Sequence, residues 1–170
     1  MKKIIFTLAI CIATLLTTTQ CTGGYSFTGA SIPPDAKTFS VAYFPNNAPM
    51  VAPVLSATLT DELTQRFASR TSLVQVEEGG DFAFEGEIVG YSSTTSSVSS
   101  GDFALQNRLT ISIKVKFTNA IDDKMSFNRN FSAYADYDST KLLTEVEGDL
   151  IPQIVEQLVT DIFQASASNW

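Results

Sequence analysis

Histidine is absent from this chain of 170 residues, and with it the side chain that most often serves as a general base or a metal ligand. Serines are numerous, but none stands with a lysine in a recognisable nucleophile motif. A hydrolase of the usual kind is therefore not expected. The sequence predicts no catalytic residue and no metal site, and it indicates a protein that is not an enzyme.

Basic residues are also scarce, since eleven lysines and arginines stand against eighteen acidic residues. The resulting negative field repels nucleic acid, so no nucleic-acid partner is expected. Long apolar runs are missing too, because no segment after the first twenty residues is long and apolar enough to span a bilayer.

The N-terminus, in contrast, has the pattern of a signal peptide. Two lysines precede the apolar run IIFTLAICIATLL, which is too short for a permanent transmembrane helix. Cys11 leaves with this peptide, and Cys21 would then remain as a lone thiol in an oxidising compartment. We therefore predict a signal peptide over residues 1–20 and a covalent lipid on Cys21 as membrane anchor, with no other cofactor. The residues TTQ before Cys21 match the usual lipoprotein box only loosely, and an ordinary cleavage nearby is the alternative.

Residues 21–36 contain glycines, small residues and a Pro-Pro pair, which predicts an extended, lipidated tether. Residues 37–170 show no internal repeat and no second hydrophobic pattern. They are predicted to form a single α+β domain, which at this size buries a sizeable core without disulfides or metals.

Strands are predicted where apolar residues alternate, and helices where they recur every three or four positions. The expected strands are Lys37–Phe44, a short one at Leu73–Val76, Phe82–Tyr91, Arg108–Phe117 and a last long one through Met125–Phe131. The expected helices are Leu55–Ser69 and a long C-terminal helix from Leu143, which Pro152 should kink or divide. The segment Ser92–Ser100 is almost entirely Ser and Thr and is predicted to be a mobile hairpin loop. The fold class is thus a two-layer α+β sandwich, with a mostly antiparallel four-stranded sheet and both helices on one face.

A hairpin that folds about position 100 pairs residues whose numbers sum to about 201. This register sets Phe84 against Phe117 and Ile88 against Ile113 on the inner face. It also sets Glu85 against Lys116 and Glu87 against Lys114 on the outer face. Arg129 falls on the apolar side of the last long strand, which indicates a bulge or a sheet edge.

The polar face of the sheet carries the only candidates for binding a phosphorylated ligand, namely Arg108, Lys114 and Lys116. The alternative is that Glu85 and Glu87 neutralise both lysines, which leaves Arg108 as the least committed of the three.

Acidic clusters have plainer explanations. The run from Asp136 to Thr140 spaces carboxylates as calcium loops do, but it lacks the glycine and the final glutamate of such a loop. A turn with helix capping by Asp138, Ser139 or Thr140 is favoured. A second set is predicted to be a solvated helix face rather than a catalytic pair: Glu145, Glu147, Asp149 and Glu156.

Over nearly the whole length after Cys21 the chain resembles the LptE-type lipopolysaccharide assembly lipoproteins, in their shorter form found outside the enterobacteria. The resemblance rests on the segments CTGGYSFTGASIPPDAKTFSVAYFPNNAP, FEGEIVGYS, QNRLTISIKVKFTN, FSAYADYDS and IVEQLVTDIF. It implies a non-catalytic two-layer plug inside the outer-membrane barrel LptD, which assists assembly of the barrel and helps lipopolysaccharide reach the outer leaflet. Lipopolysaccharide itself is a further implied partner, and the implied location is the periplasmic side of the outer membrane, attached through the lipid on Cys21.

The longer members have glycine directly after the anchoring cysteine, whereas Thr22 intervenes here, and their ligand-contacting basic positions do not map onto this chain. A scaffolding role is therefore favoured over direct transport, with the Ser/Thr loop at 92–103 expected to enter the barrel lumen or meet a loop of the barrel. Two alternatives remain open: a lipoprotein that activates or scaffolds another envelope machine, such as a peptidoglycan synthase, and a small periplasmic enzyme.

Overall fold

The computed structural model describes residues 32–50, 52–96 and 105–168, so the predicted signal peptide and Cys21 lie outside the described residues. The elements follow one another in the order β1 (Thr38–Val41), α2 (Leu55–Arg70), β2 (Val74–Gln75), β3 (Phe82–Ser96), β4 (Gln106–Asn119), a 3-10 turn (Asp123–Met125), β5 (Phe127–Asp138) and α3 (Leu143–Ala167). Both predicted helices are confirmed, and α2 buries the predicted stripe of Leu55, Leu59, Leu63 and Phe67.

The described strands form one mixed sheet in the order β2-β1-β3-β4-β5. The prediction of four strands was therefore incomplete, because the short segment after α2 joins the sheet as a fifth strand. It pairs parallel to β1, and β1 pairs parallel to β3, whereas β3, β4 and β5 are antiparallel. The predicted α+β class is confirmed. The predicted antiparallel pairing is confirmed for the three long strands, β3, β4 and β5.

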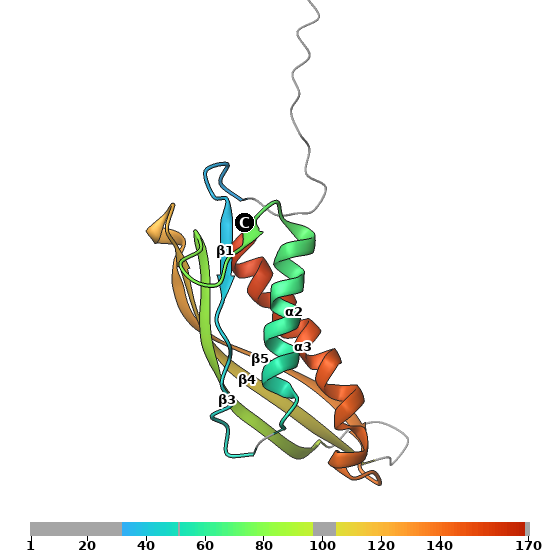
Figure 1. Cartoon of the computed structure of the whole chain (residues 1–170). Coiled ribbons are helices and arrows are strands. Elements are labelled where there is room, and N and C mark those ends of the chain that lie inside the picture. The colour runs from blue at the N-terminus through green and yellow to red at the C-terminus, as the bar shows by residue number, and fades with distance from the viewer. Residues whose placement is uncertain (1–31, 51, 97–104, 169–170) are drawn as a thin grey trace, which may run out of the picture.

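Both helices cover the same face of the sheet, and the other face carries no helix (Figure 1). The core between the layers contains buried side chains from β1 through the end of α3. A chain of phenylalanine rings crosses it, in which Phe67 of α2 contacts Phe84 of β3 and Phe163 of α3, with ring centroids 4.6 and 5.1 Å apart. Rings of α2, α3 and the sheet thus meet in one cluster.

The predicted register of the β3–β4 hairpin is confirmed at all four predicted pairs, from Phe84–Phe117 to Ile88–Ile113. One irregularity follows at Val89, after which Gly90 pairs with Ser112. The predicted loop is shorter than expected, because residues 92–96 continue β3 and pair with residues 106–110 of β4. Threonine and serine there join the ladder instead of leaving it, and residues 97–104 lie outside the described residues.

Arg129 lies on β5, which is the edge strand, and the pairing of β4 with β5 runs without a register shift. The edge explanation is thus confirmed and the bulge is not present there. Its guanidinium lies 4.9 Å from the ring centroid of Phe127.

Pro152 does not divide the C-terminal helix, since α3 runs unbroken from Leu143 to Ala167. The turn before α3 is confirmed, because the Asp138 carboxylate accepts hydrogen bonds from the N–H and hydroxyl of Thr140, at 2.8 and 2.7 Å. These bonds hold the pKa of Asp138 below its usual value. None of the three predicted residues caps the helix, however, because α3 begins at Leu143, five residues after Asp138, and its N-cap residue is Leu142.

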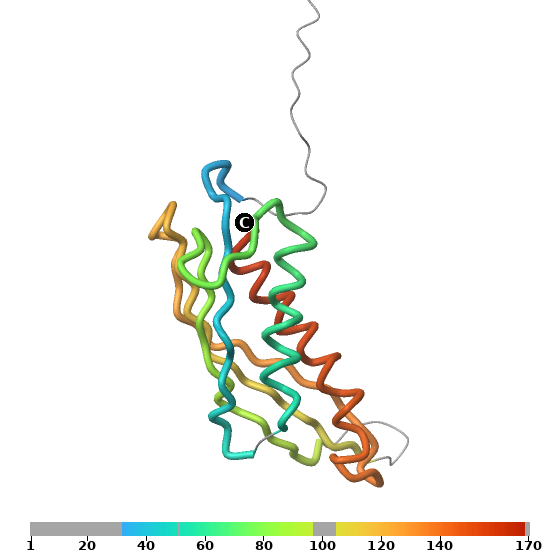
Figure 2. The backbone as a smooth tube through the Cα atoms, in the orientation of Figure 1, coloured from blue at the N-terminus to red at the C-terminus, as the bar shows by residue number. Residues whose placement is uncertain are grey.

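The domain has two different ends, which we call proximal and distal (Figures 1 and 2). The proximal end holds the first described residues, the connection between β4 and β5, and the C-terminal end of α3. The distal end holds the starts of α2 and α3 and the two ends, Ser96 and Leu105, of the β3–β4 hairpin as far as it is described. Any tether that leads to Ile32 therefore enters at the proximal end.

Candidate functional site

The helix-free face of the sheet, here called the open face, is built by alternate residues of the three long strands. Because the inner positions are apolar, the register forces polar side chains onto this face in facing rows. Its central residues are Glu85, Glu87, Thr110, Ser112, Lys114, Lys116, Asn128, Asn130, Ser132, Tyr134 and Asp136. The hydroxyls of Ser112 and Ser132 lie 3.0 Å apart across two strands, so part of the face is tied together by its own side chains.

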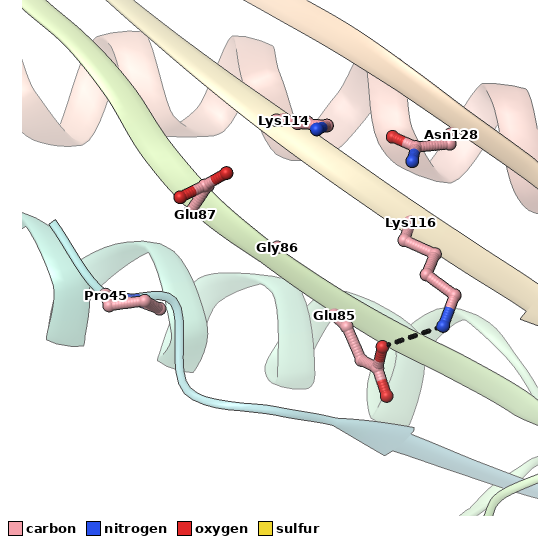
Figure 3. Close-up of a pocket in the computed structure, with 7 residues that line it drawn as sticks. All are labelled: Pro45, Glu85, Gly86, Glu87, Lys114, Lys116 and Asn128. Atoms are coloured by element: carbon pink, nitrogen blue, oxygen red, sulfur yellow. Dashed lines mark hydrogen bonds and ion pairs between the residues drawn. The ribbon is translucent and has the colours of Figure 1, made fainter. Parts of the chain in front are cut away.

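A shallow hollow of about 320 Å³ opens on this face (Figure 3). Its lining comes from three strands and from the chain that follows β1: Pro45, Glu85, Gly86, Glu87, Lys114, Lys116 and Asn128. Two of the three predicted ligand-binding residues, Lys114 and Lys116, are thus brought together, with two carboxylates of β3 opposite them.

Lys116 is paired as predicted, because its Nζ lies 3.1 Å from Oε2 of Glu85. More than half of each side chain is exposed, so solvent screens this ion pair and its contribution to stability is small. The pair contributes more to the arrangement of charges at the hollow than to the stability of the fold.

Lys114 is not neutralised, although the prediction placed Glu87 beside it correctly. Glu87 instead accepts a hydrogen bond of 2.7 Å from Nδ2 of Asn47, in the segment that runs along β3 after β1. Within the described part of the chain, the Lys114 ammonium has neither an ion pair nor a hydrogen bond. Lys114 is therefore the more available of the two lysines at the hollow.

Arg108 is the most committed of the three predicted residues, which corrects the prediction that it would be the least. Its Nε and one terminal nitrogen donate to the two oxygens of Asp136 at 2.7 and 2.9 Å. The guanidinium also lies 3.7 Å from the ring centroid of Tyr134. The paired hydrogen bonds lower the pKa of Asp136 and raise that of Arg108, so this site is a closed charge pair.

Arg108 also lies away from the lysines, since it precedes Lys114 by six residues on one strand, or about 20 Å. The register of the β3–β4 hairpin does not reveal the partner of Arg108, because that partner lies on β5. The observed β4–β5 pairs have numbers that sum to 244, which sets Arg108 opposite Asp136. The loop NAIDDK covers residues 119–124 and predicts a sum of 243, so its centre alone misses this pairing by one residue.

The predicted acidic helix face is solvated except at Glu147, whose Oε2 accepts a 2.9 Å hydrogen bond from the buried Tyr91 hydroxyl. Burial and this carboxylate raise the pKa of Tyr91. Among residues 32–50, 52–96 and 105–168, no group of three or more acidic or cysteine side chains is placed to hold a metal ion. Neither described helix is long and apolar enough to cross a membrane.

These features define a class of protein: a small two-layer α+β domain with one helix-covered face and one open, polar face. A family model described as LptE, lipopolysaccharide-assembly, matches residues 36–166. The chain therefore belongs to the LptE family of lipopolysaccharide-assembly proteins.

Two solved structures with TM-scores above 0.5 share the fold. A hypothetical protein from Chlamydia trachomatis is similar with a TM-score of 0.53 and 10% identity, over 79% of this chain and 99% of that one. A protein from Xanthomonas campestris also has a TM-score of 0.53, with 14% identity over 78% and 87% of the two chains. A minor lipoprotein from Acinetobacter baumannii has a TM-score of 0.45, with 14% identity over 77% and 93%. A search of curated protein sequences gives no match.

Proposed function

We propose that this protein is an outer-membrane lipoprotein, anchored through Cys21 and facing the periplasm, that acts as plug and assembly partner of an LptD-type barrel. In this role it supports the transport of lipopolysaccharide to the outer leaflet. The observation that carries the proposal is the family match over residues 36–166, which spans the whole described domain except its first and last few residues.

The open face supports the plug role physically. The interior of a wide outer-membrane barrel is polar, and the open face offers hydroxyls, amides and charges of both signs to such a surface. The helix-covered face keeps the apolar core sealed, so the domain can stand in a polar lumen without exposing its interior.

Direct binding of lipopolysaccharide is the narrower part of the proposal. Arg108 is already paired with Asp136, which leaves Lys114 and Lys116 at the hollow as candidate contacts for a phosphate. The chain itself carries eighteen acidic residues, and their negative field opposes the binding of anionic lipopolysaccharide. Scaffolding of the barrel is accordingly the primary role.

The test is purification of the tagged full-length protein from its own outer membrane in mild detergent, with mass spectrometry of partners and of the N-terminal peptide. We expect a large LptD-type barrel in stoichiometric amount and an acylated N-terminal cysteine at position 21. A Cys21→Ala variant is the matched control, and it should fold but leave the membrane fraction. Recovery of a peptidoglycan synthase in place of a barrel would overturn the proposal and favour the activator alternative.

A further inference from the structure

The charges of the hollow on the open face are sorted by strand. Both carboxylates, Glu85 and Glu87, lie on β3. Both ammonium groups, Lys114 and Lys116, lie on β4. Asn128 follows on β5, opposite Lys116, and its amide can donate hydrogen bonds. Because neighbouring strands are about 4.8 Å apart, the hollow changes from negative to positive across roughly one strand spacing (Figure 3).

One of the two facing charge pairs is closed and the other is open. Lys116 reaches Glu85 at 3.1 Å. Lys114 stands opposite Glu87 in the same ladder, yet within the described part of the chain these two side chains form no ion pair with each other. The open pair leaves an anion and a cation facing each other, each able to bind a ligand that lies between them.

The open pair results from the backbone of the segment that follows β1. The Ile88 N–H donates to the Pro45 carbonyl and the Asn47 N–H donates to the Ile88 carbonyl, both at 2.9 Å. These bonds hold Asn47 where its Nδ2 donates to Oε2 of Glu87 at 2.7 Å. The amide is neutral, so Glu87 keeps its charge and has further acceptor capacity. The carboxylate is thus positioned without being neutralised.

The balance of charge selects the net charge of a ligand. The hollow carries two carboxylates and two ammonium groups, so it is neutral as a whole. A simple anion would gain Lys114 but meet both carboxylates, and the acidic chain, with eighteen acidic against eleven basic residues, repels it at long range. A simple cation would meet both lysines. A ligand with both signs and no net charge avoids both conflicts.

The order of the charges selects the spacing within the ligand. Its ammonium has to lie toward β3 and its anionic group toward β4 and β5. One carbon separates the two charged groups of an α-amino acid, whereas two carbons and an ester oxygen separate nitrogen from phosphorus in an ethanolamine phosphodiester. The longer spacing suits charges on opposite sides of the hollow, and the phosphate oxygens can accept from Lys114 and Asn128 together. The volume of about 320 Å³ is at the small end of ligand sites, which suits a headgroup.

We infer that this hollow is a binding site for an ethanolamine phosphodiester. The ammonium of the ligand binds the carboxylates of Glu85 and Glu87. Its phosphate accepts hydrogen bonds from Lys114 and Asn128. Such groups occur as headgroups of membrane phospholipids and, after deacylation, as free solutes. The inference rests on the proposed function in one respect, because an envelope location brings these lipids to the hollow, and it assigns Lys114 a zwitterionic ligand in place of a simple anion.

The first experiment titrates the full-length protein, in an uncharged mild detergent, with glycerophosphoethanolamine and follows the amide signals of Glu87 and Lys114 by nuclear magnetic resonance. Glycerophosphocholine is the matched control, because it has the same spacing and net charge but no N–H donor. Glycerol phosphate is the anion-only control. The dissociation constant of the ethanolamine compound should be at least about fivefold lower than that of either control, or about 1 kcal/mol. Equal binding of either control, or no saturable binding of the ethanolamine compound, would overturn the inference.

The second experiment repeats this titration with variants. Glu87→Gln and Lys114→Gln should each weaken binding at least about fivefold. Asn47→Ala keeps all four charges but frees Glu87 to pair with Lys114, so it should weaken binding as well. Lys141→Gln, at an exposed lysine in the turn before α3, is the control and should bind as the wild type does. Unchanged melting temperatures separate loss of the ligand from misfolding, and variants that bind as tightly as the wild type would show the inference to be wrong.

Native mass spectrometry distinguishes the two sources of the ligand. The full-length protein is taken from mixed micelles of phosphatidylethanolamine and phosphatidylcholine. Selective retention of phosphatidylethanolamine by the wild type, lost in Lys114→Gln, assigns the site to a membrane headgroup, whereas binding of the soluble compound alone assigns it to the free phosphodiester. A wild type that recovers the barrel but binds neither form leaves the proposed function standing and this inference wrong. A wild type that binds the ethanolamine compound but recovers no barrel has the opposite meaning.

Discussion

Two glycines show how differently the same residue type is used in this fold. A Cβ added at Gly86 would overlap the Lys114 carbonyl and the ring of Phe44, which fills the space that the missing side chain leaves. A Cβ added at Gly148 in α3 would meet nothing within 4 Å. The first glycine is required by packing, and the second only weakens a helix.

Gly86→Ala should therefore destabilise the domain by about 2 kcal/mol, since the core has to shift to accept the methyl group. Gly148→Ala should stabilise it by about 0.5–1 kcal/mol through helix propensity. Urea unfolding of both variants checks the pair. Equal effects of the two substitutions would show that the contacts at Gly86 are looser than described.

Asp81 fixes the start of β1, because its Oδ2 accepts hydrogen bonds from the N–H groups of Lys37 and Thr38 and from the Thr38 hydroxyl, at 2.8, 2.9 and 3.0 Å. The backbone hydrogen bond from Lys37 is the main cause of a lowered pKa for Asp81. A carboxyl with a lowered pKa stabilises the fold above its ordinary pKa, and this contribution is lost as the pH falls through the lowered value.

Asp81→Asn should consequently be less stable than the wild type at pH 7, and the difference should shrink below about pH 4. Thermal unfolding across this range, with Glu78→Gln as a control in the same connection, measures it. A difference that stays constant down to pH 2 would mean that the charge of Asp81 plays no part.

At the scale of elements, local pattern was sufficient for the hairpin and insufficient for its neighbours. Alternation of core and charge on β3 and β4 specified the register, which the structure confirms from Phe84 to Ile88. The parallel pairing of β1 with β2 and β3 joins segments that are more than thirty residues apart, and no charge or turn pattern marks such a partner. The composition of residues 92–96 indicated a loop, because serine-rich segments usually leave the sheet, yet here they follow a register already set by the core.

The charged residues that face each other across the β3–β4 hairpin allow this register to be tested by mutation. Glu85→Lys places like charges opposite Lys116 and should destabilise the domain by less than about 1 kcal/mol, given the exposure of the pair. Adding Lys116→Glu should restore most of the loss. A double-mutant cycle in low and high salt checks this, and a coupling energy of zero in low salt would contradict the pairing.

The first two turns of α3 contain no fully buried residue, since the buried residues of this helix begin at Leu150. Within these turns Glu147 accepts a hydrogen bond from Tyr91. Tyr91→Phe keeps the ring and removes the bond, at a cost of about 0.5–1.5 kcal/mol. Amide hydrogen exchange should become faster over residues 143–149 and remain unchanged over residues 154–163, whose side chains form the buried stripe. Tyr43→Phe, an exposed tyrosine, is the control, and uniform acceleration along α3 would refute a local effect.

At the scale of the whole molecule, β1, both helices and the three long strands share one core, which runs without a break from Ala36 to Ala167. A chain that begins at residue 32 should therefore unfold in a single transition, followed by circular dichroism and by tyrosine fluorescence with coincident midpoints. Two separate transitions would mean that α3 and the β3–β5 sheet form a unit of their own. The single domain predicted from the hydrophobic pattern is tested directly by this measurement.

The candidate site was predictable to the same extent as the sheet. The position of the two lysines at the hollow follows from the β3–β4 register, whereas the pairing of Arg108 with Asp136 depends on the β4–β5 register. The availability of Lys114 depends on Asn47, which binds Glu87 from a segment with no regular sequence pattern.

The entry of the tether at the start of β1 has a mechanical consequence. β1 lies inside the sheet, with β2 on one side and β3 on the other, and both neighbours run parallel to it. If the tether carries the proposed lipid, a pull on it against a domain held by its partner would act along the strand and load both ladders in shear. Their hydrogen bonds would then have to break together instead of one by one. The proposed anchor would thus be joined to the domain through a strand that is placed to resist being drawn out.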